Sequence, residues 1–201
     1  MRMMTENKFR EYTPKHSVLK REYKNYATYK RYLIKDFHHR CGYCHDHDKF
    51  FGGTRNYQID HFVPQTRFDD LATKYDNLIY SCPFCNRSKW DKWVGETPEE
   101  NIKDNKGFIH PCDDDYEKHF TRNEKFEIIP TDEIGQYMHK ELCLYLKRHS
   151  IINFLDKLDT KIIKIKKLQS DKNIQLTSEE EKIFYQALFR FHDYFNILNE
   201  D

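Results

Sequence analysis

Two Cys-x-x-Cys pairs, Cys41/Cys44 and Cys82/Cys85, are the feature that most constrains the fold of this 201-residue chain. In a reducing environment such pairs favour a metal over disulfide bonds, and four thiolates complete the tetrahedral shell of a structural Zn²⁺. The 37 residues between the pairs exceed the roughly 15–20 of a simple zinc ribbon. We therefore expect an inserted hairpin to be held between two knuckles, by a zinc that has no open position for a substrate.

The insert between the two knuckles contains two strand-like runs, and a helix is expected after it. Residues 57–63 are typical of a β-strand that ends at Pro64, and residues 78–80 form a second run of this kind. Asn86, directly after the second knuckle, is expected to open a helix that continues to about Trp93. The segment thus predicts a β-hairpin followed by a helix, clamped by the four cysteines.

Polar side chains suited to cation binding and proton transfer fall within this hairpin and helix. Asp60 offers a carboxylate and Asn86 an amide oxygen, so together they can hold one Mg²⁺ or Mn²⁺ beside water and phosphate oxygens. His61 points to the other side of the strand, and it can take a proton from water because its pKa lies near neutrality. Asn77 precedes the second strand, where its side chain can fix the backbone of His61. An Asp-His pair alone is commonly an ordinary surface pair, but its place between the knuckles favours a catalytic site.

Charge is distributed unevenly along a chain whose net charge is only +1. Residues 1–40 carry 11 Lys and Arg against 4 Asp and Glu, whereas residues 94–201 carry 16 against 22. A helix is expected from Ser17 to about His39, and a polyanion is expected to dock on this basic segment. A solvated amphipathic helix packed on the core is the alternative interpretation. The candidate nucleic-acid contacts are Lys20, Lys24, Arg31, Arg87 and Lys89.

The rest of the chain predicts a mixed connection followed by helices. Short strands are expected at residues 108–111 and 126–130, and helices at about 132–146, 150–168 and 182–198, with a break at 171–173. Thr177 and Glu180 have the spacing of a capping box. These helices are interpreted as core or as a partner surface, and Cys112 and Cys143 as small buried hydrophobic residues.

The pattern Cys-x-x-Cys, Ile-Asp-His-Phe-Val-Pro, Asp-Asn-Leu and Cys-x-x-Cys-Asn-x-x-Lys over residues 41–89 resembles the HNH endonucleases, which have a ββα-metal finger. The resemblance implies that His61 is the general base, that Asp60 and Asn86 bind the catalytic metal, and that Asn77 is structural. Asn86 stands where the final His is commoner in the family, which leaves the metal preference open. Beyond the finger, the layout is similar to small HNH proteins of Septu-type and retron-associated antiphage systems, which pair with an ATPase.

We therefore expect an α+β fold, a zinc-stabilised ββα-metal finger with a basic N-terminal helical segment (1–40), a nuclease core (41–95) and a C-terminal helical region (96–201). The expected function is metal-dependent hydrolysis of phosphodiester bonds, with DNA favoured over RNA, in antiviral defence. An ATPase subunit is expected to dock on the C-terminal helices. The alternatives are a non-catalytic zinc-stabilised nucleic-acid-binding module and an adaptor subunit. No apolar run is long enough for a membrane helix and no signal peptide is evident, so a cytoplasmic protein is expected.

Overall fold

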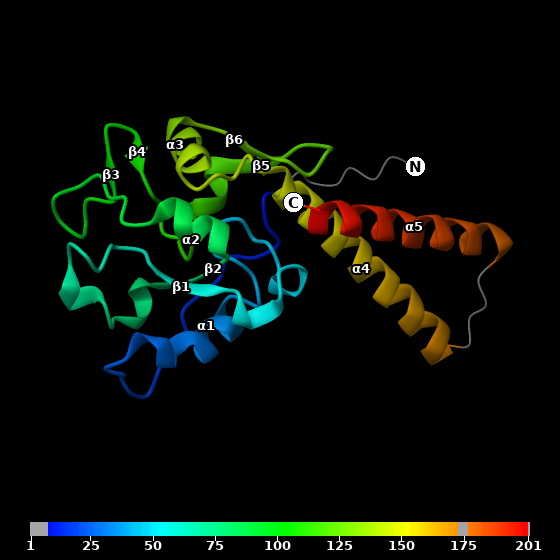
Figure 1. The fold of residues 1–201 in the computed structure, drawn as a ribbon, viewed down its shortest axis with the longest axis horizontal. Helices are drawn as coiled ribbons and strands as arrows, with labels where there is room; N and C mark the ends of the chain where they lie inside the picture. Colours follow the sequence, from blue (N-terminus) through cyan, green and yellow to red (C-terminus); the bar gives the residue numbers. More distant parts are fainter. Residues whose placement is uncertain (1–7, 173–176, 201) are drawn as a thin grey trace. The chain divides into compact units, whose positions relative to one another are not determined.

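The computed structural model describes residues 8–172 and 177–200 (Figure 1). The chain divides into two compact units, residues 1–146 and residues 147–201. The expected segments 1–40 and 41–95 therefore share one unit with part of the segment 96–201. Each unit is described by itself.

The first unit is built around a hairpin and a short helix. Strands β1 (Gln58–His61) and β2 (Leu78–Ser81) pair antiparallel, with Asp60 opposite Ile79 and His61 opposite Leu78. Helix α2 (Pro83–Lys89) follows β2 directly and packs against β1 (Figure 1). This arrangement is the expected ββα finger. The helix begins three residues earlier than expected, because Cys82 caps it through Sγ and Pro83 is pre-formed for its first turn.

The two cysteine knuckles meet beneath the hairpin. The Sγ atoms of the four cysteines lie within 4.8 Å of one another and all four residues are buried. The Sγ atoms of Cys44 and Cys82 are 3.8 Å apart, which is about the edge of a tetrahedron with Zn–S bonds of ~2.3 Å. Gly42, inside the first knuckle, donates its N–H to the carbonyl of Tyr80 at 2.8 Å. A Cβ atom at Gly42 would lie 2.7 Å from Ile79 Cγ2, so only glycine lets the knuckle approach β2 this closely.

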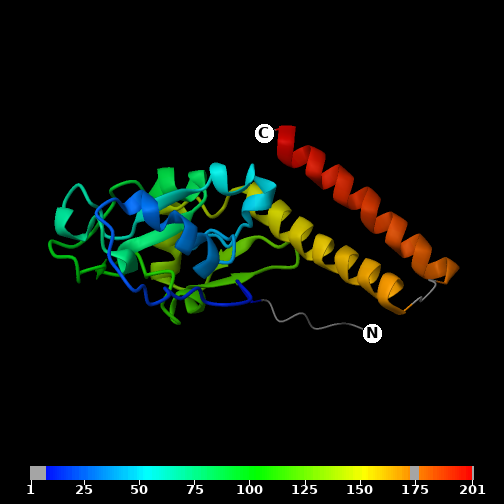
Figure 2. The same ribbon diagram turned by 90° about the horizontal axis from the view of Figure 1, so that it is seen from below.

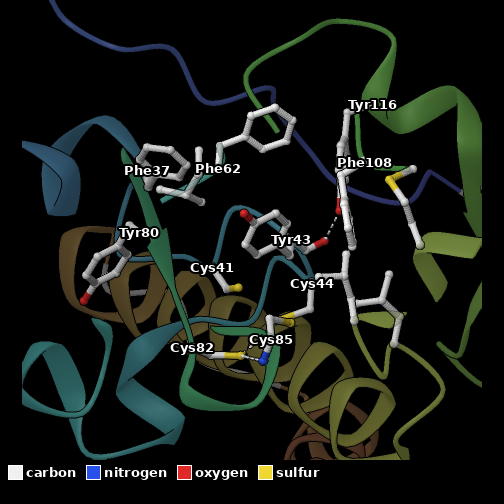
Figure 3. Packing of buried hydrophobic residues seen from close by; sticks show 14 of the residues in the cluster. Phe37, Cys41, Tyr43, Cys44, Phe62, Tyr80, Cys82, Cys85, Phe108 and Tyr116 are labelled. Atoms are coloured by element: carbon white, nitrogen blue, oxygen red, sulfur yellow. Dashed lines mark hydrogen bonds between the residues drawn. The ribbon is translucent and has the colours of Figure 1, made fainter. Parts of the chain in front are cut away.

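Aromatic side chains supply much of the core, as the low content of aliphatic residues requires. Tyr43 lies fully buried beside the cysteines, and its carbonyl accepts a hydrogen bond of 2.9 Å from the hydroxyl of Tyr116 (Figure 3). Leu33 of helix α1 (Lys30–Asp36) and Phe37, the residue that follows this helix, pack on the same cluster. The buried tyrosine hydroxyls find polar partners, so these rings fill the core and also fix the loops around it.

The prediction of a helix from Ser17 to about His39 is wrong in its length. Only Lys30–Asp36 forms an α-helix, preceded by a 3-10 turn at Tyr26–Tyr29 that Asn25 caps. Before that turn, the N–H of Tyr23 donates to the hydroxyl of Tyr29 at 2.8 Å. The spacing of tyrosines that resembled a helical face instead serves contacts between loops.

Small hairpins and one helix complete the first unit. Strands β3 (Ile102–Lys103) and β4 (Lys106–Gly107) form one hairpin, and β5 (Phe120–Arg122) and β6 (Ile128–Pro130) another. Helix α3 (Glu133–Glu141) packs against β4 and β6. The strand expected at 108–111 is absent from the described residues, because β4 ends at Gly107. The strand expected at 126–130 is confirmed in its last three residues.

The second unit consists of helices α4 (Lys147–Lys172) and α5 (Ser178–Glu200), which pack against each other (Figure 2). The capping box before α5 is confirmed: the N–H of Thr177 donates to Glu180 Oε2 at 2.9 Å, and the N–H of Glu180 donates to Thr177 Oγ1 at 3.3 Å. Of the expected break, residues 171 and 172 belong to α4, and Asn173 lies outside the described residues. Among the residues that the structure describes, no helix has the length and apolar character needed to cross a membrane.

The cysteine cluster gives a prediction about stability. Cys82→Ser removes one of the four thiolates, while the serine hydroxyl can still cap α2, so we expect loss of bound zinc and unfolding of the finger through the metal site alone. Zinc content by atomic absorption and thermal unfolding by circular dichroism measure both effects. Cys143→Ser is the matched control, since Cys143 lies outside the cluster. A normally folded, zinc-free Cys82→Ser protein would contradict a structural role for the metal.

Candidate active site

A cleft of about 250 Å³ opens where β1 ends and α2 faces it. Asp60 and His61 reach the cleft from β1, and Asn86 reaches it from α2. The structure thus brings together three of the four residues expected to carry the chemistry. The cleft is also lined by Tyr26, Ile59, Pro64, Gln65, Thr66, Trp90 and Asp91.

Asp60 is a buried carboxylate, only 5% exposed. Its Oδ2 accepts a hydrogen bond of 2.5 Å from the hydroxyl of Tyr43 and lies 3.5 Å from Lys89 Nζ. Burial raises the pKa of Asp60, and the positive charge of Lys89 opposes that rise. Among the described residues both polar contacts of this carboxylate use Oδ2, so Oδ1 remains available to a cation in the cleft.

The ring of His61 is held in one orientation. Its Nε2 lies 2.9 Å from the carbonyl oxygen of Ala72. A carbonyl only accepts hydrogen bonds, so Nε2 carries the proton and Nδ1 of the neutral ring has a free lone pair. The ring of Tyr26 meets the His61 ring edge-on, with 4.8 Å between centroids. Burial lowers the pKa of His61, which favours the neutral ring that can accept a proton.

Asn86 lies in the middle of α2, and its amide is oriented by a neighbour on β1. Its Nδ2 donates a hydrogen bond of 2.5 Å to Gln58 Oε1. With the amide nitrogen engaged in this way, Oδ1 of Asn86 remains available as a ligand. A carboxylate oxygen from Asp60 and an amide oxygen from Asn86 are ligand types that Mg²⁺ and Mn²⁺ prefer.

Asn77 lies outside the cleft and holds the loop between the two strands. Its Oδ1 accepts a hydrogen bond of 2.7 Å from the N–H of Val63, and its Nδ2 donates to the carbonyls of Val63 at 3.0 Å and Leu71 at 3.2 Å. Val63 lies two residues after His61, and Leu71 precedes the Ala72 carbonyl that orients the His61 ring. The side chain therefore holds the backbone two residues after His61 and the loop that carries the Ala72 carbonyl.

Lys89 does not lie where a nucleic-acid contact requires it. Its side chain is fully buried, and Nζ donates to the carbonyl of His61 at 2.9 Å in addition to its contact with Asp60. Burial lowers the pKa of Lys89, and Asp60 opposes that effect. The expectation that Lys89 binds phosphate on the surface is corrected: this lysine joins α2 to β1 under the cleft. Arg87, on the same helix, is exposed.

The expected basic contacts of the N-terminal segment lie on the surface. Lys20, Lys24 and Arg31 are exposed. The guanidinium of Arg31 lies 5.0 Å from the centroid of the Tyr32 ring and 3.4 Å from the Tyr23 hydroxyl. None of the three lines the cleft. Their contact with nucleic acid stays a prediction.

Several contacts that shape the site are not predicted from the sequence, although Lys89 itself is expected there as a nucleic-acid contact. Tyr43 and Lys89 both contact Asp60, and Gln58 orients Asn86. Tyr43 lies within the first knuckle, and Lys89 lies one helical turn after Asn86, so each occupies a position set by the cysteine pattern. Tyr26, the first residue of the 3-10 turn, and Trp90, the residue that ends α2, also border the cleft.

Residues 41–92 match the family model described as HNH endonuclease. The chain is also 26% identical over 162 residues to a Septu protein PtuB of Bacillus mycoides (strain KBAB4), an alignment covering 70% of this chain and 53% of that protein. The chain thus spans about half the length of this curated relative. No solved structure matches the chain. With the ββα hairpin, the four-cysteine cluster and the cleft in place, residues 41–92 are a domain of the HNH endonuclease family, in a chain similar to a Septu protein PtuB.

Proposed function

We propose that this protein is a metal-dependent endonuclease that hydrolyses phosphodiester bonds, with DNA favoured over RNA. The observation that carries the proposal is the geometry of the cleft. It combines two oxygen ligands for a cation, on Asp60 and Asn86, with a histidine whose ring is oriented by the Ala72 carbonyl. A nucleic-acid-binding module needs neither a buried carboxylate nor an oriented base.

The residues of this chain have separate roles in the proposed reaction. Asp60 and Asn86 would hold a divalent cation, Mg²⁺ or Mn²⁺, which would offset negative charge on the phosphate and on the leaving oxygen. Nδ1 of His61 takes a proton from water, the resulting hydroxide attacks phosphorus, and the opposite P–O bond breaks. The Ala72 carbonyl stabilises the imidazolium that forms. Asn77 and Lys89 act as positioning residues, since each bonds to the backbone next to the site.

The four cysteines form a second, separate metal site in this proposal. Their sulfur atoms fit a tetrahedral Zn²⁺ whose shell is complete. Zinc there holds the hairpin to α2 and takes no part in the reaction. The two metals therefore differ in ligand chemistry, thiolate against oxygen, and in how readily they exchange.

We further propose that the C-terminal helices bind a protein partner, which the resemblance to Septu-type systems suggests to be an ATPase subunit in antiphage defence. Several large apolar side chains on α5 are exposed, among them Tyr185 at 58% and Phe189 at 70%. The acidic excess of the C-terminal half lies in residues 94–146, with 6 Lys and Arg against 13 Asp and Glu, whereas residues 147–201 carry 10 against 9. Apolar contact rather than acidity therefore supports docking on the helices.

The base assignment predicts the effect of His61→Ala. Cleavage of DNA in the presence of Mg²⁺ or Mn²⁺ is expected to fall by about 10²–10⁴-fold, because the variant lacks the proposed general base. Zinc content should stay at the wild-type value and the fold should stay intact. His192→Ala, an exposed histidine of the second unit, is the matched control. Full activity of His61→Ala would refute the assignment. If wild type binds DNA or RNA without cutting any, the non-catalytic module is the correct alternative.

The metal assignment predicts a different signature for Asn86→Ala. The variant loses one oxygen ligand, so cleavage is expected to fall at low Mg²⁺ and to recover partly as the metal concentration rises. Asn86 is preferable to Asp60 for this test, because removing the Asp60 carboxylate also leaves Lys89 buried without its partner charge. Cleavage rates measured against Mg²⁺ concentration decide the point. A rate reduced equally at every metal concentration would contradict a ligand role.

The docking proposal predicts the effect of Tyr185→Ser combined with Phe189→Ser. Both side chains are exposed and lie one helical turn apart, so the free protein should keep its thermal stability and its DNA cleavage. Co-elution with an ATPase subunit in gel filtration should be lost. Lys182→Ala on the same helix serves as the control. Co-elution of the double variant at the wild-type level would exclude this face, and cleavage that occurs only in the complex would favour the adaptor alternative.

A further inference from the structure

Trp90 is a large apolar side chain at the rim of the cleft, and it is 70% exposed. The chain has only two tryptophans, and the other one has the opposite environment. Trp93 is 9% exposed, its ring meets Phe62 edge-on at 5.5 Å, and its Nε1–H donates to the carbonyl of Thr97 at 3.0 Å. Burial in the core thus accounts for a tryptophan at position 93, but it does not account for one at position 90.

The backbone at Trp90 also disfavours a large side chain. Trp90 ends α2 with φ 49° and ψ −126°, a conformation that glycine adopts readily and that a residue with a Cβ rarely adopts. Neither local conformation nor burial therefore accounts for tryptophan at this position. Strained backbone that presents a side chain to a cleft is characteristic of residues that contact a ligand.

The chemistry of the cleft identifies the ligand that such a ring would meet. Asp60, His61 and Asn86 line the same cleft as Trp90, so a phosphodiester bound beside the first three places an adjoining nucleoside near the rim where Trp90 lies. A nucleobase has an apolar, polarisable face, and stacking on tryptophan removes both surfaces from water. Stacking requires that the face of the base be uncovered, which is the case in a single strand but not inside a regular duplex.

We propose that Trp90 stacks on a base next to the phosphodiester that is cut, and that the cleft consequently prefers a strand whose bases are unpaired at that point. The proposal rests on the proposed nuclease function and specifies its substrate. Single strands, loops and frayed or kinked duplexes meet the requirement. Because every base has such a face, Trp90 selects strand conformation rather than base sequence.

Fluorescence provides the direct test, since Trp90 is exposed and Trp93 is a buried internal reference. Full-length His61→Ala protein is titrated with a fluorescein-labelled single-stranded oligonucleotide, or with its duplex, in DNA and RNA forms. Label anisotropy reports binding independently. Tryptophan emission is expected to be quenched by the single strand more than by the duplex. The quenching should disappear in the His61→Ala, Trp90→Phe double variant, which still binds through its phenyl ring.

Cleavage by single variants gives the second readout. Trp90→Gly is expected to raise KM for single strands by about 5- to 150-fold, and Trp90→Phe should recover most of the loss. The unfolding temperature of Trp90→Gly should be equal to or above that of wild type, because glycine fits this backbone. A purely structural tryptophan would instead lower it.

The outcomes separate this inference from the proposed function. Unchanged kcat/KM in Trp90→Gly, or unchanged tryptophan emission while anisotropy reports binding, would overturn the stacking role and leave the nuclease standing. Equal cleavage of single strand and duplex would overturn the preference for unpaired bases. Wild-type protein that binds and cuts neither DNA nor RNA would overturn both. If the emission of Trp90 is quenched only when a protein partner binds, the ring belongs to the interface with that partner instead.

Discussion

The candidate site depends on how strand β1 is held against helix α2. The two strands of the hairpin have four residues each, and an isolated hairpin of this size is marginally stable in water. The cysteine cluster fastens the end of β2 and the start of α2 to the first knuckle, while the N–H of Gly42 bonds to the carbonyl of Tyr80. Because Asp60 and Asn86 lie on opposite sides of this junction, their separation is set by thiolate geometry rather than by strand pairing alone.

Lys89 is the second link between β1 and α2, and it acts through an ion pair and a hydrogen bond rather than through a metal. A buried lysine and a buried carboxylate are each costly to remove from water, and their attraction offsets that cost only when the geometry is good. Lys89 meets this requirement by contacting both Asp60 and the carbonyl of His61. The pair therefore adds little net stability but admits one arrangement of helix and strand. A divalent cation beside Asp60 would meet a carboxylate that is already held in place by Tyr43 and Lys89.

The sequence predicts this site well where function depends on local spacing, and poorly where it depends on distant contacts. The cysteine pairs, the strand containing Asp60 and the capping box at Thr177 are all encoded within a few residues, and each is found close to its expected position. The helix expected from Ser17 fails because the segment before α1 is held through tyrosine hydroxyls: the N–H of Tyr23 donates to the Tyr29 hydroxyl at 2.8 Å, and the hydroxyls of Tyr23 and Tyr32 lie 2.9 Å apart. A pattern of apolar positions does not distinguish such contacts from a helical face.

Helix α2 explains how one short element serves the metal cluster, the buried ion pair and the cleft. Cys82, Cys85 and Lys89 are spaced by three and four residues, so they share the face that packs into the protein, and all three are buried. Asn86 and Trp90 are four residues apart on a neighbouring face, and both line the cleft. The left-handed backbone at Trp90 then ends the helix and turns the chain, which allows Trp93 to enter the core. Trp90, whose positive φ ends the helix, thus connects α2 to the segment that enters the core, and its own side chain lines the cleft.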